Sequence, residues 1–74
     1  MLQEVRKAKG FSQNDLALLS NVNLRMIQHY EQGVKDINVA KLDTLLNLSI
    51  ALECSIKDLL TNEELIEKCK RTSL

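Results

Sequence analysis

The chain has 74 residues, which is too few for two ordinary domains or for a large enzyme with a buried active site. An apolar fraction of 45% and a charged fraction of 27% exclude a disordered chain and are ordinary for a globular domain. Ten basic and ten acidic residues balance each other, so the net charge argues against a strong binder of nucleic acid.

Residue usage favours helices over strands. The chain has no proline, two glycines and two aromatic residues, whereas Leu, Ile and Val occupy 23 positions. No apolar run approaches the roughly 18 residues that cross a bilayer, and the N-terminal residues lack a signal-peptide pattern. We therefore expect a cytoplasmic protein with no membrane partner. Cys54 and Cys69, with a single histidine elsewhere, predict reduced structural thiols and no metal site.

The first predicted helix covers residues 2–9, where apolar side chains recur every three positions and Gly10 follows as a stop signal. A second helix is predicted over residues 13–19. Ser12 stands before it and Asp15 follows three residues later, which resembles a capping box with Asp in place of Glu.

The third predicted helix begins after Asn23, a residue type that commonly caps helix N-termini. It extends to Gln32, and Gly33 stops it. Three or four residues therefore separate the second helix from the third.

The second half of the chain predicts one long helix and two short ones. Asn38 is the expected N-cap of a helix over residues 39–53, whose apolar residues surround most of its circumference and suit a central or interface position. Ser55 with Asp58 resembles a capping box that opens a short helix over residues 56–60.

A last helical stretch is predicted to start at Thr61, which has Glu64 three residues later, and to run through Leu65, Ile66 and Cys69. Two interpretations of Leu65 and Ile66 stay open, because they could pack on their own chain or on a second subunit. The expected fold is all-α: a compact five-helix domain over residues 1–61 and a C-terminal helical extension over residues 62–74.

Two short helices joined by so few residues, the second followed by Glu31 and Gly33, suggest a helix-turn-helix. At about 100° per residue, one continuous arc of the third helix is polar except for its first residue, and the opposite arc carries Met26, Ile27, Tyr30 and Glu31. A helix that enters the DNA major groove needs this division between an inner and an outer face. The outer arc consists of Leu24, Arg25, Gln28, His29 and Gln32.

With these features the chain resembles the phage-repressor family of helix-turn-helix regulators, also called the Cro-type or xenobiotic-response-element family. The resemblance covers about residues 2–60, and the order and spacing of its parts are more specific than any single part. The matching parts are Val5-Arg6 with Gly10, Phe11-Ser12-Gln13 with Leu16-Ala17, Val22-Asn23 with Ile27, Glu31-Gln32-Gly33, residues 42–52, and Ser55-Ile56-Lys57-Asp58-Leu59-Leu60.

The resemblance implies roles for individual residues. Gln13 would touch a phosphate and brace the reading helix, whereas Leu24, Arg25 and Gln28 would face the edges of bases. Arg6 and Glu31 occupy the positions of a partly buried ion pair in the family. The predicted DNA-binding residues are Gln13, Asn23, Leu24, Arg25, Gln28, His29, Gln32 and Lys35.

Each of these residues also has an ordinary structural interpretation. Arg25 could be a solvated surface charge, His29 an ordinary surface histidine, and Tyr30 a core residue with its hydroxyl at the surface. Leu24 could contact a thymine methyl group or a protein.

The sequence also departs from the family pattern. Asn21 and Glu53 stand where the family usually has glycine, and the loop after Gly33 is about three residues longer than usual and lacks its common proline. Asparagine tolerates the left-handed backbone, so we expect the turn at Asn21 to form.

Two functions from different classes follow. The first is a sequence-specific transcriptional regulator of double-stranded DNA, expected to be a homodimeric repressor with no cofactor, no small-molecule substrate and no enzymatic activity. Residues 1–35 carry a net charge of +2 and residues 36–74 carry −2, which places the positive half on the expected DNA side. The alternative is a protein-interaction module on the same scaffold, such as an antitoxin-like or bridging factor.

Overall fold

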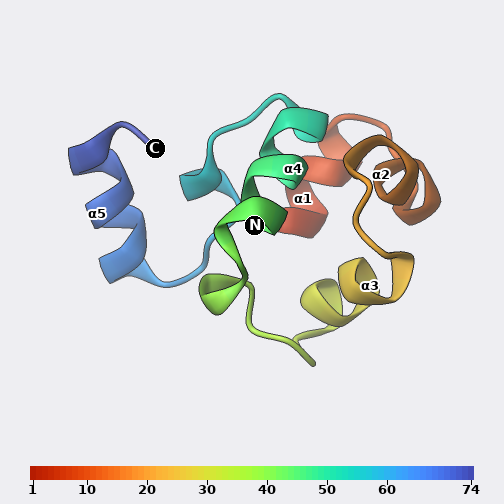
Figure 1. Cartoon of the computed structure of the whole chain (residues 1–74), viewed down its shortest axis with the longest axis horizontal. Helices are drawn as coiled ribbons and strands as arrows, with labels where there is room; N and C mark the ends of the chain where they lie inside the picture. Colours follow the sequence, from red (N-terminus) through yellow and green to blue (C-terminus); the bar gives the residue numbers. More distant parts are fainter.

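The computed structural model describes all 74 residues, and it is entirely helical (Figure 1). This confirms the predicted all-α class. None of the helices combines the length and the apolar character needed to cross a membrane. In chain order the elements are α1 (Leu2–Ala8), α2 (Gln13–Ser20), α3 (Leu24–Gln32), the 3-10 turn η1 (Ile37–Val39), α4 (Leu42–Leu52), the 3-10 turn η2 (Ile56–Asp58) and α5 (Glu63–Thr72).

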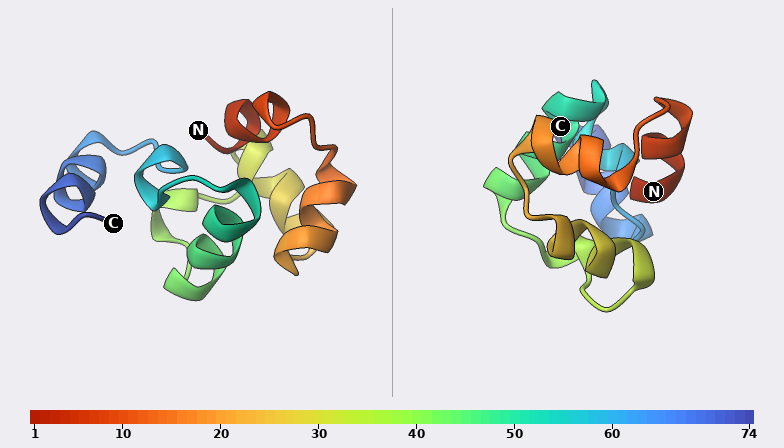
Figure 2. Two further views of the ribbon diagram at one scale, coloured as in Figure 1. Left: turned by 90° about the horizontal axis from the view of Figure 1, so that it is seen from above. Right: turned by 90° about the vertical axis from the view of Figure 1, so that its right-hand side faces the viewer.

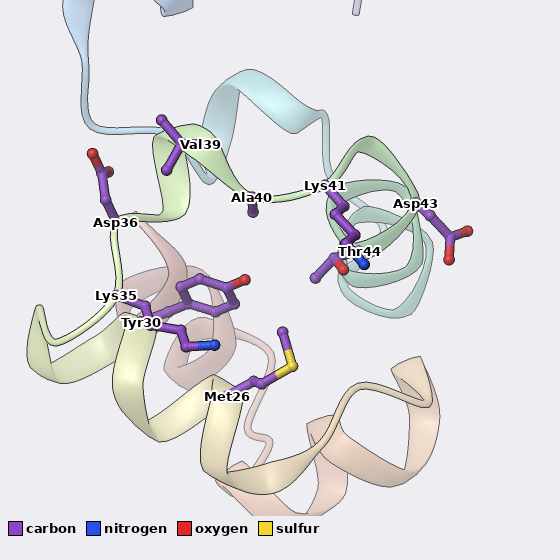
Figure 3. Close-up of a pocket in the computed structure, with 9 residues that line it drawn as sticks. All are labelled: Met26, Tyr30, Lys35, Asp36, Val39, Ala40, Lys41, Asp43 and Thr44. Atoms are coloured by element: carbon purple, nitrogen blue, oxygen red, sulfur yellow. The ribbon is translucent and has the colours of Figure 1, made fainter.

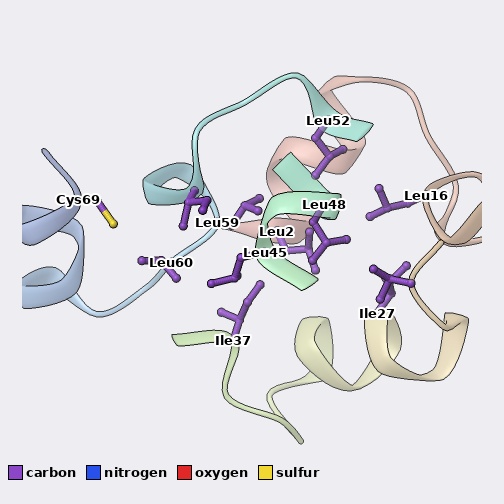
Figure 4. Close-up of a cluster of buried hydrophobic side chains, with 12 residues drawn as sticks. Leu2, Leu16, Ile27, Ile37, Leu45, Leu48, Leu52, Leu59, Leu60 and Cys69 are labelled. Atoms are coloured by element: carbon purple, nitrogen blue, oxygen red, sulfur yellow. The ribbon is translucent and has the colours of Figure 1, made fainter. Parts of the chain in front are cut away.

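Helix α4 lies at the centre and packs against α2, which also contacts α3, while α1 contacts α3. Helices α2 and α3 lie at one end of the long axis and α5 at the other, where it packs on η2 (Figures 1 and 2). Side chains from most of these elements meet in one apolar cluster (Figure 4). The fully buried members are Leu16, Ile27, Leu48, Leu52 and Leu59.

Local signals set the helix boundaries in the first half. The Ser12 hydroxyl accepts from the Asp15 amide at 3.0 Å and the Asp15 carboxylate accepts from the Ser12 amide at 2.9 Å, which completes the expected capping box. Gly10 and Gly33 adopt φ of +77° and +78°, a backbone conformation that strains any residue with a Cβ. The three predicted helices agree with the structure to within one residue at each end.

The predicted start of the fourth helix was wrong. Residues 37–39 form the separate turn η1, and α4 begins at Leu42, three residues later than expected. Asn38 is not an N-cap, because its side-chain oxygen instead accepts hydrogen bonds from two distant amides, those of Thr61 and Asn62. Asp36 caps η1, with its carboxylate accepting from the Asn38 amide at 2.9 Å.

The predicted fifth helix is also shorter than expected. The capping box of Ser55 and Asp58 forms, but it opens only the turn η2, because Leu59 and Leu60 turn into the core. At the end of α4, Glu53 takes the left-handed conformation with φ of +52°, where the family has glycine.

Helix α5 (Glu63–Thr72) begins two residues after the predicted start at Thr61 and is capped differently. The Asn62 side chain accepts from the Leu65 amide at 3.1 Å, whereas the Thr61 hydroxyl is used by Asn38. Leu65 and Ile66 pack against the apolar cluster, as does Cys69, which is buried. These side chains therefore fold back on their own chain.

Candidate nucleic-acid interface

The turn between α2 and α3 is held from inside by Ser20. Its hydroxyl donates to the Leu16 carbonyl at 2.6 Å and accepts from the Val22 amide at 3.2 Å, with the side chain buried. Asn21, which lies between Ser20 and Val22, adopts φ of +58°, the left-handed conformation expected there. The sequence interpretation ended the second helix at residue 19 and missed Ser20, although serine side chains within a helix commonly bond the carbonyl four residues earlier.

Helix α3 starts at a side-chain cap. The Asn23 side-chain oxygen accepts from the Arg25 amide at 2.8 Å, so this oxygen is engaged in the fold while Asn23 itself stays exposed. The cap fixes the direction of the first turn of α3, from which Leu24 and Arg25 project.

The inner face of α3 is anchored and its outer face is free. Ile27 is fully buried, and Met26 and Tyr30 pack against the core. On the opposite side Arg25 and Gln32 are exposed. The other three members of the outer arc, Leu24, Gln28 and His29, are partly exposed.

A bidentate ion pair joins α1 to α3. Arg6 donates from Nε to one Glu31 oxygen at 2.7 Å and from Nη2 to the other at 2.9 Å, and its Nη1 donates to the Phe11 carbonyl at 2.8 Å. The two side chains are only 9% and 2% exposed, so the charges are withdrawn from water. Every buried side-chain polar atom of the protein has a partner.

Burial alone would raise the pKa of the Glu31 carboxyl. Hydrogen bonds from Arg6 and Gln13, together with the Arg6 charge, outweigh it, so the pKa of Glu31 lies below its ordinary value. The hydrogen bond to Glu31 raises the pKa of Arg6 despite the opposing effect of burial. Both groups are therefore charged at neutral pH.

Gln13, at the start of α2, belongs to the same network. Its Nε2 donates to Glu31 at 3.0 Å, which ties the N-terminus of α2 to the far end of α3. A glutamine amide has a second N–H, so a phosphate contact by the same side chain is compatible with this bond. The sequence interpretation gave Gln13 a bracing role but did not name Glu31 as its partner.

A hollow with a volume of about 480 Å³ lies between the inner side of α3 and the start of α4 (Figure 3). Met26 and Tyr30 rise into it from α3. Two lysines line it, the predicted Lys35 and the unpredicted Lys41, which the sequence interpretation placed inside a helix. Asp36 and Asp43 also line it, so the hollow carries both signs of charge.

A family model described as helix-turn-helix matches residues 2–59, more than three quarters of the chain. The chain belongs to the XRE-type, Cro/C1-like helix-turn-helix family. It is therefore a DNA-binding, helix-turn-helix transcription regulator. Neither the curated proteins nor the solved structures contain a significant match to the chain. Helix α5 lies beyond the matched residues.

Proposed function

We propose that the chain is a sequence-specific repressor that binds DNA as a homodimer and reads the major groove with the outer face of α3. The observation that supports this most is the sidedness of α3. Ile27 and Glu31 hold its inner face in the protein, while Arg25 stands exposed on the outer face. A helix held in this way can enter the major groove without breaking any contact inside the protein.

The proposed contacts follow from side-chain chemistry. Arg25 donates in a fork to guanine, Gln28 pairs with adenine, and Leu24 lies against a thymine methyl group. Asn23 and Gln32 flank these contacts at the two ends of α3. Phosphates are contacted at the edge of the site by Gln13, His29 and Lys35.

The charge distribution supports modest affinity. Residues 1–35 carry only +2, so each subunit neutralises few phosphates and its affinity falls gently with salt. Two linked subunits would bind more tightly, with reading helices roughly 34 Å apart on adjacent turns of the duplex.

An exposed apolar stripe on α4 supports the dimer. Leu42, Leu46 and Ile50 recur every four residues on one side of the helix, with Leu42 59% and Ile50 73% exposed. Ridges with this spacing interdigitate when two helices cross. A two-fold axis through the stripe would bury the same side chains from both subunits.

Selection from random duplexes tests the proposal. The wild-type chain is expected to enrich one pseudo-palindromic motif, and the double variant Arg25→Ala/Gln28→Ala to lose that enrichment while keeping its helical content. Arg71→Ala is the matched control, because it removes the same charge from exposed α5 at the opposite end of the molecule. No enrichment by the wild type at low salt, or an unaffected double variant, would contradict the proposal.

One observation favours the second candidate, a protein-interaction module. Leu18 on α2 is 84% exposed, and with Leu19 and Phe11 it lines an apolar hollow outside the outer face of α3. Under that function Leu18→Ser would abolish binding of a protein partner and leave selection of DNA unchanged.

A further inference from the structure

Asn38 makes four side-chain hydrogen bonds, three of which join the loop after α3 to the base of α5. Its Oδ1 accepts from the amides of Thr61 and Asn62, each at 2.9 Å. Its Nδ2 donates to the Asp36 carboxylate and to the Thr61 hydroxyl, each at 2.8 Å. The three bonds to Thr61 and Asn62 span 23 or 24 residues of sequence, so they fix two segments that the chain alone would leave independent.

The same loop is fastened at its other end to α3. The amides of Val34 and Lys35 donate to the His29 carbonyl at 2.9 Å and 3.1 Å. Lys35 therefore lies between two anchors, with its own amide tied to α3 and the next residue, Asp36, tied to Asn38. Lys35 is exposed, but hydrogen bonds on both sides of it hold its backbone in place.

The far anchor is itself rigidly placed. Asn62 caps α5 by accepting from the Leu65 amide, and Cys69 of α5 is buried in the core cluster. Thr61 and α5 lie outside residues 2–59, the part that matches the family. A segment outside the family fold thus holds a loop of the DNA-side surface.

We propose that Asn38 is a positioning residue that holds Lys35 at a DNA phosphate by bracing its loop against the base of α5. Through this brace α5 contributes to DNA binding without touching DNA. The inference rests on the proposed function, because the phosphate contact of Lys35 is part of it.

Asparagine suits this position because it accepts two bonds through oxygen and donates two through nitrogen. Aspartate could accept from the two amides but could not donate, and its charge would face Asp36. Asn38→Asp therefore breaks half of the brace with almost no change in side-chain volume. Thr61→Val breaks the single bond to the hydroxyl, and Thr61→Ser is its matched control because it keeps the hydroxyl.

The test is a double-mutant cycle read out by the salt dependence of binding to a mixed-sequence duplex of about 30 base pairs. Loss of one phosphate contact lowers the slope of log affinity against log salt by about 0.9. Lys35→Ala is expected to lower the slope by this amount, and Asn38→Ala by nearly as much. The double variant Lys35→Ala/Asn38→Ala is expected to have the same slope as Lys35→Ala alone. Thr61→Val should show a smaller loss and Thr61→Ser none.

A brace that only stabilises the fold gives a different result. Asn38→Ala would then lower the melting temperature but leave the salt slope of the folded protein unchanged, and that overturns the inference. Additive losses from Lys35→Ala and Asn38→Ala overturn it as well. Should Asn38→Ala not fold, the comparison of Thr61→Val with Thr61→Ser decides, because equal slopes for the two contradict the brace.

Two further arms separate this inference from the proposed function. A wild-type chain that does not bind the duplex, or an Arg25→Ala variant that binds as well as wild type, contradicts the proposed function and with it the brace. Binding that depends on Arg25 and Lys35 but not on Asn38 contradicts the brace alone.

Discussion

Two polar networks hold α3 and the loop that follows it, one withdrawn from water and the other at the surface. The network of Arg6, Gln13 and Glu31 is charged and withdrawn from water, and it joins the last turn of α1 and the start of α2 to the end of α3. The network of Asp36, Asn38, Thr61 and Asn62 lies at the surface and depends mainly on neutral amides, hydroxyl and backbone groups. The first fixes α3 itself and the second fixes the loop that follows it.

The two networks differ in how much stability the fold loses when each is broken. A buried charge that loses its partner keeps its desolvation penalty, so the fold suffers. A surface amide that loses its partner is solvated by water, so the fold changes little and only position is lost. The buried network should therefore govern stability, and the surface network should govern geometry.

The sharpest contrast is expected from Arg6→Ala, which strands the Glu31 carboxylate in a site where it is 2% exposed. Such a loss costs about 3–5 kcal/mol of the free energy of unfolding, measured by urea denaturation. Replacement of both partners, as in Arg6→Met/Glu31→Leu, should recover most of that loss because no charge is stranded. An Arg6→Ala variant as stable as the wild type would contradict the claim that the buried network governs stability.

Acid should weaken the buried network. The pKa of Glu31 in the folded protein lies below its ordinary value of 4.5, so its contribution to stability is fully present above that pH. It is lost as the pH falls through the folded pKa. Urea denaturation at a series of pH values should show the wild type approaching Glu31→Gln below about pH 4.5. A constant difference between the two proteins down to pH 2 would show that Glu31 is not the group responsible.

Gln13→Ala should have an intermediate effect. It removes one hydrogen bond to a charged group but leaves Arg6 in place, and we expect a loss of about 1–2 kcal/mol in the free energy of unfolding. Asn14→Ala on the exposed side of α2 is the matched control and should change stability by less than about 0.5 kcal/mol. Equal effects of the two would place Gln13 outside the network.

The smallest loss of stability is expected from Asn38→Ala. Its partners are exposed to water when the side chain is removed, so we expect a cost of about 0.5–1 kcal/mol, independent of pH between about 5 and 8. Thermal unfolding at several pH values checks this. A cost that approaches that of Arg6→Ala would remove the distinction between the two networks.

The contrast also explains which features the sequence could predict. Helices α1 to α3 depend on signals that lie within a few residues of each boundary, such as the capping box of Ser12 and Asp15 or the stop at Gly33. The inner and outer faces of α3 follow from helical periodicity alone. The family resemblance added the pairing of Arg6 with Glu31, which are 25 residues apart.

Features that depend on distant partners could not be predicted. Asn38 has the residue type of an N-cap, but its oxygen is used by amides 23 and 24 residues away, so the start of α4 was misplaced. Thr61 and Asn62 are both good caps, and only the contact of Thr61 with Asn38 leaves the capping role to Asn62. No local pattern distinguishes such neighbours, because the choice is made by tertiary contacts.

The most direct test of the account is to follow the backbone amide signals of the isotope-labelled chain during titration with a duplex that it has enriched. We predict that the largest shifts occur at Arg25, Gln28 and Lys35, with the amides of α5 shifting only near Thr61 and Asn62. Shifts confined to the exposed leucines of α2, with α3 unchanged, would contradict the claim that α3 reads DNA.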